Sequence, residues 1–197
     1  MQLIETIKCK DGKLENLDFH QARLENTQKE YLGKSQNINL FEIEIPDYAQ
    51  AGLYRCRITF LKSIEKIEFF KHEYRKIKTL KIVEDSSIDY HLKFANRNHL
   101  LKLYQKREKC DDIIIVKDGF VTDSFAANIV LFNGKHWVTP NTPLLPGTQR
   151  AKLLKENKII ESEIKIDKLW TYRKIGLINA LNDFNEMPVI DIKNVVK

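Results

Sequence analysis

Apolar and polar positions follow a pattern that predicts many short strands and few helices. Strands are expected where β-branched and aromatic residues alternate with polar ones or form short apolar runs. They are predicted at residues 2–9, 53–60, 67–70, 80–83, 111–116, 127–132, 135–138 and 159–164, with two more in the C-terminal tail. Asp11-Gly12-Lys13 and Asn133-Gly134 are typical of the turns that join antiparallel strands.

Four segments carry helical patterns instead. They span residues 19–32, 96–107, 148–156 and 167–172. The first should begin after Asp18 as N-cap, with Gln21 completing a capping box, and end at Gly33. Because several strands follow one another with few helices between them, the order favours an α+β fold over a doubly wound parallel sheet. A change of character near Asp85 divides the chain into a small N-terminal lobe, residues 1–86, and a larger C-terminal lobe, residues 87–197.

Composition limits the kind of protein but does not assign it. The 197 residues are 43% hydrophobic, as in chains that bury a core. No apolar stretch approaches the roughly 20 residues that span a bilayer, and the N-terminus lacks a signal-peptide pattern. We therefore expect a soluble, cytoplasmic protein. Its formal charge of +6 arises from lysines interleaved with acids, which is typical of a solvated surface.

Cysteines and histidines give no sign of a metal site. The three cysteines are far apart and form no CxxC pair, and the five histidines lack HxxxH or HExxH spacing. We expect no metal and no disulfide framework.

Four separated segments contain the residues suited to chemistry. They are Asp11-Gly12-Lys13 with His20-Gln-Ala-Arg23-Leu24, then Lys93-Phe-Ala-Asn96-Arg97, then Gly119-Phe-Val-Thr-Asp123-Ser-Phe-Ala-Ala-Asn128, and finally Thr139-Pro140 leading to Gly147-Thr148-Gln149-Arg150. In this order they resemble the class IV aminotransferases, the fold type IV pyridoxal-phosphate enzymes, over nearly the whole chain. Within that family the 4-amino-4-deoxychorismate lyases are the most similar. The resemblance implies a two-lobed fold like that of D-amino-acid and branched-chain aminotransferases, with pyridoxal 5'-phosphate as cofactor.

The resemblance assigns the Schiff-base lysine to Lys93, where an amine can hold the cofactor aldehyde and later move protons. Arg23 corresponds to the arginine that grips the cofactor phosphate, for which a planar guanidinium is suited. His20 lies three residues earlier, so both side chains can point inward from one helix face. By themselves, Lys93 would be one surface lysine among many and Arg23 could equally form a surface ion pair.

Three further positions complete the expected site. Asp123 stands where the family normally has glutamate, facing the pyridine nitrogen. The alternative interpretation is a structural aspartate in a turn after Thr122. Thr148 and Gln149 open a helix whose free N–H groups can seat a phosphate, while Thr148 could instead cap the helix. Thr6 corresponds to a threonine that lines the lyase active site.

The chain also departs from the family pattern. It begins almost at the strand that contains Thr6, without two earlier strands, which implies a shortened N-terminal lobe. The loop after Tyr54-Arg55-Cys56-Arg57 lacks the glycine and arginine that help relatives bind substrate carboxylates. A tyrosine that many aminotransferases carry is Asn98 here.

Three functions remain open from the sequence. The first is a lyase that forms p-aminobenzoate and pyruvate from 4-amino-4-deoxychorismate, a step toward folate. The second is an aminotransferase for a D-amino acid or a branched-chain amino acid. The third is a non-catalytic family remnant or a basic binding protein, although no nucleic-acid-binding motif is present. For an enzyme, the resemblance implies a small-molecule amino substrate and a homodimer, with no nucleic acid or membrane partner.

Overall fold

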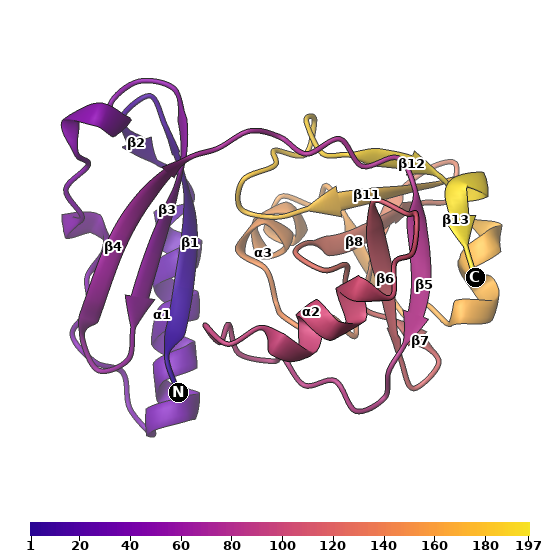
Figure 1. Ribbon diagram of the computed structural model, residues 1–197, viewed down its shortest axis with the longest axis horizontal. Coiled ribbons are helices and arrows are strands. Elements are labelled where there is room, and N and C mark those ends of the chain that lie inside the picture. The colour runs from indigo at the N-terminus through magenta and orange to yellow at the C-terminus, as the bar shows by residue number, and fades with distance from the viewer. The chain divides into compact units, whose positions relative to one another are not determined.

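The computed structural model describes all 197 residues, and they form two compact units (Figure 1). The first unit comprises residues 1–74 and 92–96, and the second comprises residues 75–91 and 97–197. The boundaries of these units differ from the single boundary expected at residue 86. Residues 80–84 pair with a strand of the second unit, whereas residues 92–96 pair with the first strand of the chain. Lys93 therefore belongs to the N-terminal unit.

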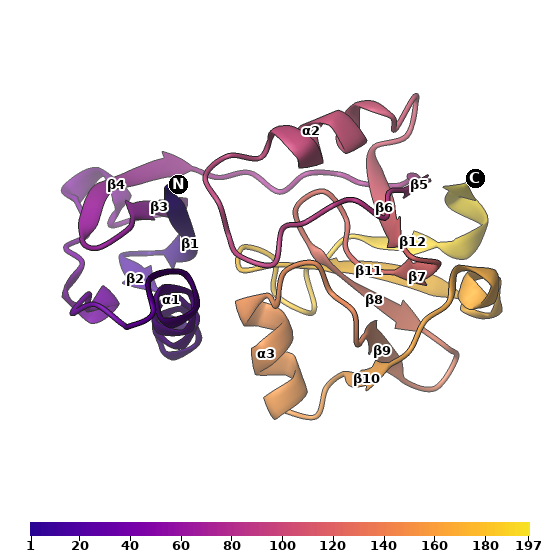
Figure 2. The same cartoon turned by 90° about the horizontal axis from the view of Figure 1, so that it is seen from below.

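A four-stranded antiparallel sheet and one long helix build the first unit. Strand order is β2-β1-β3-β4, and α1 lies along one face of the sheet (Figures 1 and 2). The elements are β1 (Leu3–Lys10), β2 (Lys13–Leu14), α1 (Leu17–Leu32), two 3-10 helices (Leu40–Glu42 and Asp47–Ala49), β3 (Leu53–Phe60) and β4 (Ile64–Lys71).

Helix α1 packs through one stripe of side chains at helical spacing. His20, Leu24, Thr27 and Gln28 are its buried residues, which is the i, i+4, i+7, i+8 pattern of an amphipathic helix. Leu24 joins the core that the odd-numbered residues of β1 form with alternate residues of β3. Because side chains alternate along a strand, the even-numbered residues of β1 lie on the opposite face of the sheet.

The start of α1 differs from the capping box expected at Asp18 and Gln21. The helix begins two residues earlier, with Asn16 as N-cap in the left-handed region and no capping side chain. The Gln21 amide is used elsewhere, since its Oε1 accepts from Leu40 N–H at 2.9 Å. The end at Gly33, with φ of 75°, is as predicted.

Two sheets and two helices build the second unit. One sheet has the order β10-β9-β8-β11-β12 and the other β13-β5-β6-β7. The elements are β5 (Leu80–Glu84), α2 (Asn98–Gln105), β6 (Asp112–Lys117), β7 (Phe120–Val121), β8 (Asn128–Phe132), β9 (Trp137–Pro140), α3 (Thr148–Lys155), β10 (Ile160–Ser162), 3-10 helices at Ile166–Thr171 and Ile192–Asn194, β11 (Lys174–Ile178), β12 (Val189–Asp191) and β13 (Val195–Val196).

The core of this unit lies between its two sheets. Strand β6 is buried on both faces, as its run of apolar residues predicts, and contributes Ile114 and Val116 to that core. Helices α2 and α3 lie on opposite sides of the strands (Figure 2).

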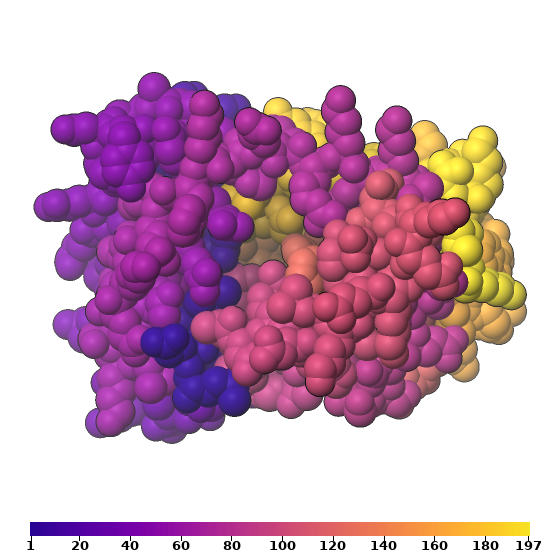
Figure 3. Space-filling model, in the orientation of Figure 1, coloured from indigo at the N-terminus to yellow at the C-terminus, as the bar shows by residue number.

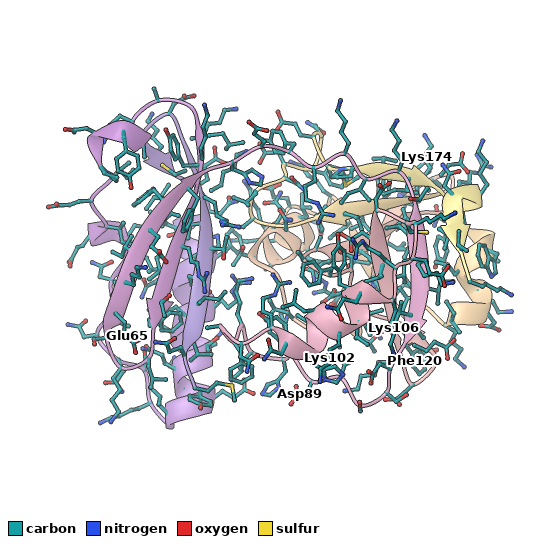
Figure 4. The ribbon with its side chains drawn as sticks, in the orientation of Figure 1. Glu65, Asp89, Lys102, Lys106, Phe120 and Lys174 are labelled. Carbon is teal, nitrogen blue, oxygen red and sulfur yellow. The ribbon has the colours of Figure 1, made fainter.

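Helix α2 is amphipathic. Its Leu100 and Leu103 are buried, whereas Lys102 and Lys106 lie on its exposed face (Figure 4). The segment around α2 covers the viewer's side of the second unit in the space-filling view (Figure 3). The exposed lysines place much of the positive charge in solvent. None of the helices has the length and hydrophobicity that crossing a membrane requires.

Candidate active site

The segment that carries Lys93 is fixed to the open edge of β1. Strand β2 pairs only with the last two residues of β1. The backbone groups near Leu3 on this edge therefore need partners from another segment. Ile4 N–H donates to Lys93 O at 2.9 Å, and Leu3 pairs with Phe94. Phe94 packs on the same core as Leu3. Phe94 N–H also donates to Leu92 O at 2.9 Å, so the backbone turns tightly at Lys93, and the charge of Lys93 acts on His20 of α1.

A buried cluster of three ionisable groups lies next to this edge. Glu5 of β1 is 1% exposed, and its carboxylate accepts from Arg23 Nε at 2.8 Å and from Arg23 Nη2 at 2.6 Å. His20 Nδ1 lies 2.7 Å from Glu5 Oε2. His20 and Arg23 thus reach the same carboxylate from one face of α1, as their i, i+3 spacing predicts.

Protonation within the cluster follows from burial and charge. Burial by itself would raise the pKa of Glu5, but the charge of Arg23 and the hydrogen bonds from His20 and Arg23 outweigh it and hold that pKa far below the usual range. Burial lowers the pKa of His20, and the charges of Arg23 and Lys93 lower it further against the effect of Glu5. At neutral pH, His20 is therefore a neutral donor to an ionised Glu5.

Thr6 lies on the other face of the sheet, among cations that sequence reasoning did not single out. The register places Thr6 opposite Arg57 and Lys8 opposite Arg55, so all four side chains share one face. The Nε atoms of Arg55 and Arg57 are buried and have no hydrogen-bond acceptor. An Arg-x-Arg pattern in a predicted strand is the signal that could have identified this face, because residues two apart point the same way.

Asp123, in the second unit, is a buried carboxylate with two fixed partners. Asn128 Nδ2 donates to its Oδ1 at 2.8 Å, and Leu145 N–H donates to its Oδ2 at 3.0 Å. Burial raises the pKa of Asp123 to about 6, although these hydrogen bonds and the charge of Arg150 oppose the rise. The group can therefore change protonation near neutral pH.

Asn128 also connects Asp123 to the start of α3. Its Nδ2 donates to Leu145 O at 2.8 Å, and its Oδ1 would lie 2.0 Å from a Cβ added to Gly147. Only glycine therefore fits immediately before the helix. Thr148 and Gln149 follow as the first helical residues, both buried, with Gly147 as N-cap and no capping side chain. Thr148 does not cap this helix.

The loop after Asp123 is held by stacked rings and guanidinium groups. Arg97 lies over the Phe125 ring at 4.3 Å and donates through Nη2 to Phe125 O at 2.6 Å. The Phe125 and Tyr104 rings stack with their centres 4.3 Å apart. The guanidinium carbon of Arg107 lies 4.2 Å from the centre of the Tyr104 ring. These contacts anchor the loop that leads from Asp123 to Asn128 onto α2.

The expected site residues thus form two groups. Lys93, Arg23 and Thr6 belong to the first unit, and Asp123 with the Thr148-Gln149 pair belongs to the second.

Comparison with known proteins matches the chain over nearly its whole length. The family model for amino-transferase class IV matches residues 2–193. An uncharacterized protein of Haemophilus influenzae is 40% identical over 183 residues, which are 91% of this chain and 97% of that protein. A proposed 4-amino-4-deoxychorismate lyase from Haemophilus somnus has a crystal structure that matches with a TM-score of 0.81 and 35% identity, over 93% of this chain and 98% of that one. The structure of a proposed amino-acid aminotransferase from Mesorhizobium loti matches with a TM-score of 0.82, over 99% of both chains, but at 21% identity it supports the fold alone.

The chain belongs to the class IV aminotransferase family. The fold and the enzyme class predicted from the sequence are confirmed, including dependence on pyridoxal phosphate.

We expect the buried Asp123 to make stability fall with rising pH in cofactor-free protein. A carboxyl whose pKa is raised by folding holds its proton more tightly in the folded state, so its contribution is present below about pH 4 and is lost as the pH rises to about 6. A shift of about two pKa units corresponds to about 3 kcal/mol. The free energy of unfolding of Asp123→Asn, relative to wild type, should therefore rise by about that much between pH 4 and pH 7.

Denaturant titrations at a series of pH values measure this difference. Asp118→Asn, on an exposed turn, removes the same charge. Its free energy of unfolding plotted against pH should run parallel to that of wild type. Parallel curves for Asp123→Asn as well would contradict the raised pKa.

Proposed function

We propose that the protein is a pyridoxal-phosphate-dependent 4-amino-4-deoxychorismate lyase that forms p-aminobenzoate and pyruvate, a precursor step toward folate. The observation that carries this proposal is the fixed position of the Lys93 segment on the edge of β1, next to the Glu5–His20–Arg23 cluster. The 35% identity to the proposed lyase of Haemophilus somnus supports a lyase in particular.

The residues present are suited to pyridoxal phosphate. Lys93 supplies the amine for its aldehyde, Arg23 a guanidinium for its phosphate, and Asp123 a buried acid for its ring nitrogen. The start of α3, at Thr148 and Gln149, is a helix N-terminus, which favours the negative charge of a phosphate. Asp123 is one methylene shorter than the usual glutamate, and its hydrogen bonds from Asn128 and Leu145 keep the shorter side chain in one orientation.

When bound, the cofactor supplies an aldehyde that joins the substrate amine and a ring that withdraws electrons. Lys93 Nζ then acts as the base and acid: it removes a proton from the substrate ring carbon that bears the amine, and a proton is returned to the departing enolpyruvyl group. Pyruvate leaves and the ring becomes aromatic, which makes the elimination strongly favourable. The protein therefore needs one well-placed base more than an elaborate set of catalytic groups.

A dicarboxylate substrate needs cations, and the sheet face around Thr6 has them. Arg55 and Arg57 lie there with Thr6, and their buried Nε atoms have no acceptor within the protein, whereas Lys8 of the same face is already paired with Glu15 at 3.5 Å. We propose that this face takes the carboxylate-binding role of the loop that the chain lacks. The homodimer and the cytoplasmic location that the resemblance implies belong to the same proposal.

Lys93 is expected to be the residue that holds the cofactor. Wild type incubated with pyridoxal phosphate and then reduced with borohydride should carry the cofactor covalently on the Lys93 peptide, as mass spectrometry can show. Lys93→Ala should show no site-specific attachment of the cofactor. Lys102→Ala, on the exposed face of α2, should be labelled at Lys93 as wild type is. Equal labelling of wild type and Lys93→Ala would contradict the assignment.

Product analysis distinguishes the lyase from an aminotransferase. With 4-amino-4-deoxychorismate, we expect equal amounts of p-aminobenzoate and pyruvate and no accumulation of the pyridoxamine form of the cofactor. An aminotransferase would instead convert the cofactor to that form when given a D-amino acid or a branched-chain amino acid. Conversion of the cofactor by amino acids, without cleavage of the chorismate derivative, would replace the lyase by the second function.

Removing one cation from the sheet face should weaken substrate binding. We expect Arg57→Gln to raise KM for 4-amino-4-deoxychorismate by roughly 10- to 100-fold, because a charge-assisted hydrogen bond contributes about 1.5–3 kcal/mol. Cofactor attachment to Lys93 should be unchanged. Arg173→Gln, an exposed arginine of the second unit, alters the net charge equally and serves as control. An unchanged KM for Arg57→Gln would exclude this face as the carboxylate site.

A further inference from the structure

The Arg23 guanidinium is held along one edge only. A guanidinium has a side edge, formed by Nε–H and one Nη–H, and an end edge, formed by N–H groups of both Nη atoms. Glu5 occupies the side edge, since its Oε1 accepts from Nε at 2.8 Å and its Oε2 from Nη2 at 2.6 Å. Arg23 is 13% exposed while Glu5 is 1% exposed. The end edge, Nη1 and the second N–H of Nη2, is therefore the edge available to a ligand.

Glu5 is itself fixed from two directions. Its backbone is in the centre of β1, paired with Ile58 of β3. Its Oε2 also lies 2.7 Å from His20 Nδ1, and burial keeps the pKa of His20 low. His20 therefore donates a hydrogen bond without adding a second positive charge. The carboxylate cannot rotate without breaking bonds to both partners, so its direction sets the direction of the Arg23 fork.

A buried carboxylate is a costly residue at this position. A well-packed apolar side chain is often as stabilising as a buried ion pair, or more so, and the neighbours of Glu5 on this face, Leu3 and Ile7, are apolar and fully buried. The charge is thus better explained by orientation of Arg23 than by stability.

We propose that Glu5 is a positioning residue for the cofactor phosphate: by occupying the side edge of Arg23, it directs the end edge of the guanidinium to the phosphate oxygens. This inference rests on the proposed function, in which Arg23 binds that phosphate. A phosphate bound through two parallel N–H groups gains both energy and fixed geometry. Without Glu5, the guanidinium would rotate, and the same arginine would offer the phosphate a single, movable donor.

The test compares two cofactor forms that differ only in the phosphate. Pyridoxal has the same ring and aldehyde as pyridoxal phosphate but lacks the group that Arg23 is proposed to bind. Glu5→Gln keeps the size of the side chain but replaces one acceptor oxygen by a donor, so the paired contact with Arg23 is lost. Absorbance titration of the full chain should show affinity for pyridoxal phosphate reduced on the order of tenfold or more, with affinity for pyridoxal changed less than about twofold.

Two further variants define the origin of the effect. Glu30→Gln, at an exposed position of α1, removes the same charge and should leave both affinities unchanged. Arg23→Lys should lose the preference for pyridoxal phosphate as Glu5→Gln does, and the double variant should lose no more than either single one, because both act through one guanidinium. If Glu5→Gln does not fold by far-UV circular dichroism, Glu5→Asp carries the test, because it keeps the charge but shortens the side chain that reaches Nε and Nη2 of Arg23: a loss confined to pyridoxal phosphate supports the proposal, and equal losses for both cofactor forms contradict it.

Several results would overturn the proposal. Tighter binding of pyridoxal phosphate by Glu5→Gln would mean that Glu5 competes with the phosphate for Arg23. Equal losses for both cofactor forms would mean that Glu5 only maintains the fold, as would an additive double variant. A wild type that attaches neither form at Lys93 would remove the proposed function as well, whereas attachment at Lys93 with no phosphate preference would overturn the role of Glu5 alone.

Discussion

The arrangement of the first unit depends on the unpaired edge of β1. Strand β2 is only two residues long, so the backbone groups around Leu3 and Ile4 need partners from elsewhere. The segment from Leu92 to Asn96 supplies them, although it is about ninety residues away in sequence. Backbone pairing of this kind fixes position without restricting side-chain identity. A lysine can therefore be held at that edge by main-chain contacts alone.

The same strand also determines the charges next to the lysine. Alternation along β1 gives it two chemically different faces: Glu5 meets His20 and Arg23 on the face that α1 covers, and Thr6 lies with Arg57 on the other. The ionised Glu5 balances Arg23 inside the protein, where an isolated charge would be strongly destabilising. On the opposite face, the buried Nε atoms of Arg55 and Arg57 have no hydrogen-bond acceptor, and the proposed function assigns them to the substrate carboxylates. One strand thus separates the proposed phosphate contact from the proposed carboxylate contacts.

In the second unit, the single side chain of Asn128 links Asp123 to the start of α3. Asn128 donates to the carboxylate and to Leu145 O, and its side chain leaves space for no residue larger than glycine at position 147. One amide therefore sets both the orientation of an acid and the path of the chain into a helix. The shorter acid at position 123 is compatible with this network because both of its oxygens have fixed donors.

The sequence by itself determined most local structure and the identity of the family. Alternation and apolar runs predicted the strands, helical spacing predicted α1 with its end at Gly33, and four short motifs in order were specific enough for the class. What only the tertiary structure decided were the partners. That Arg23 pairs with Glu5 and that Lys93 belongs to the N-terminal unit depend on contacts between residues far apart in sequence. Periodicity reports which face of an element is buried, but which residue of another element meets that face depends on how the whole chain packs.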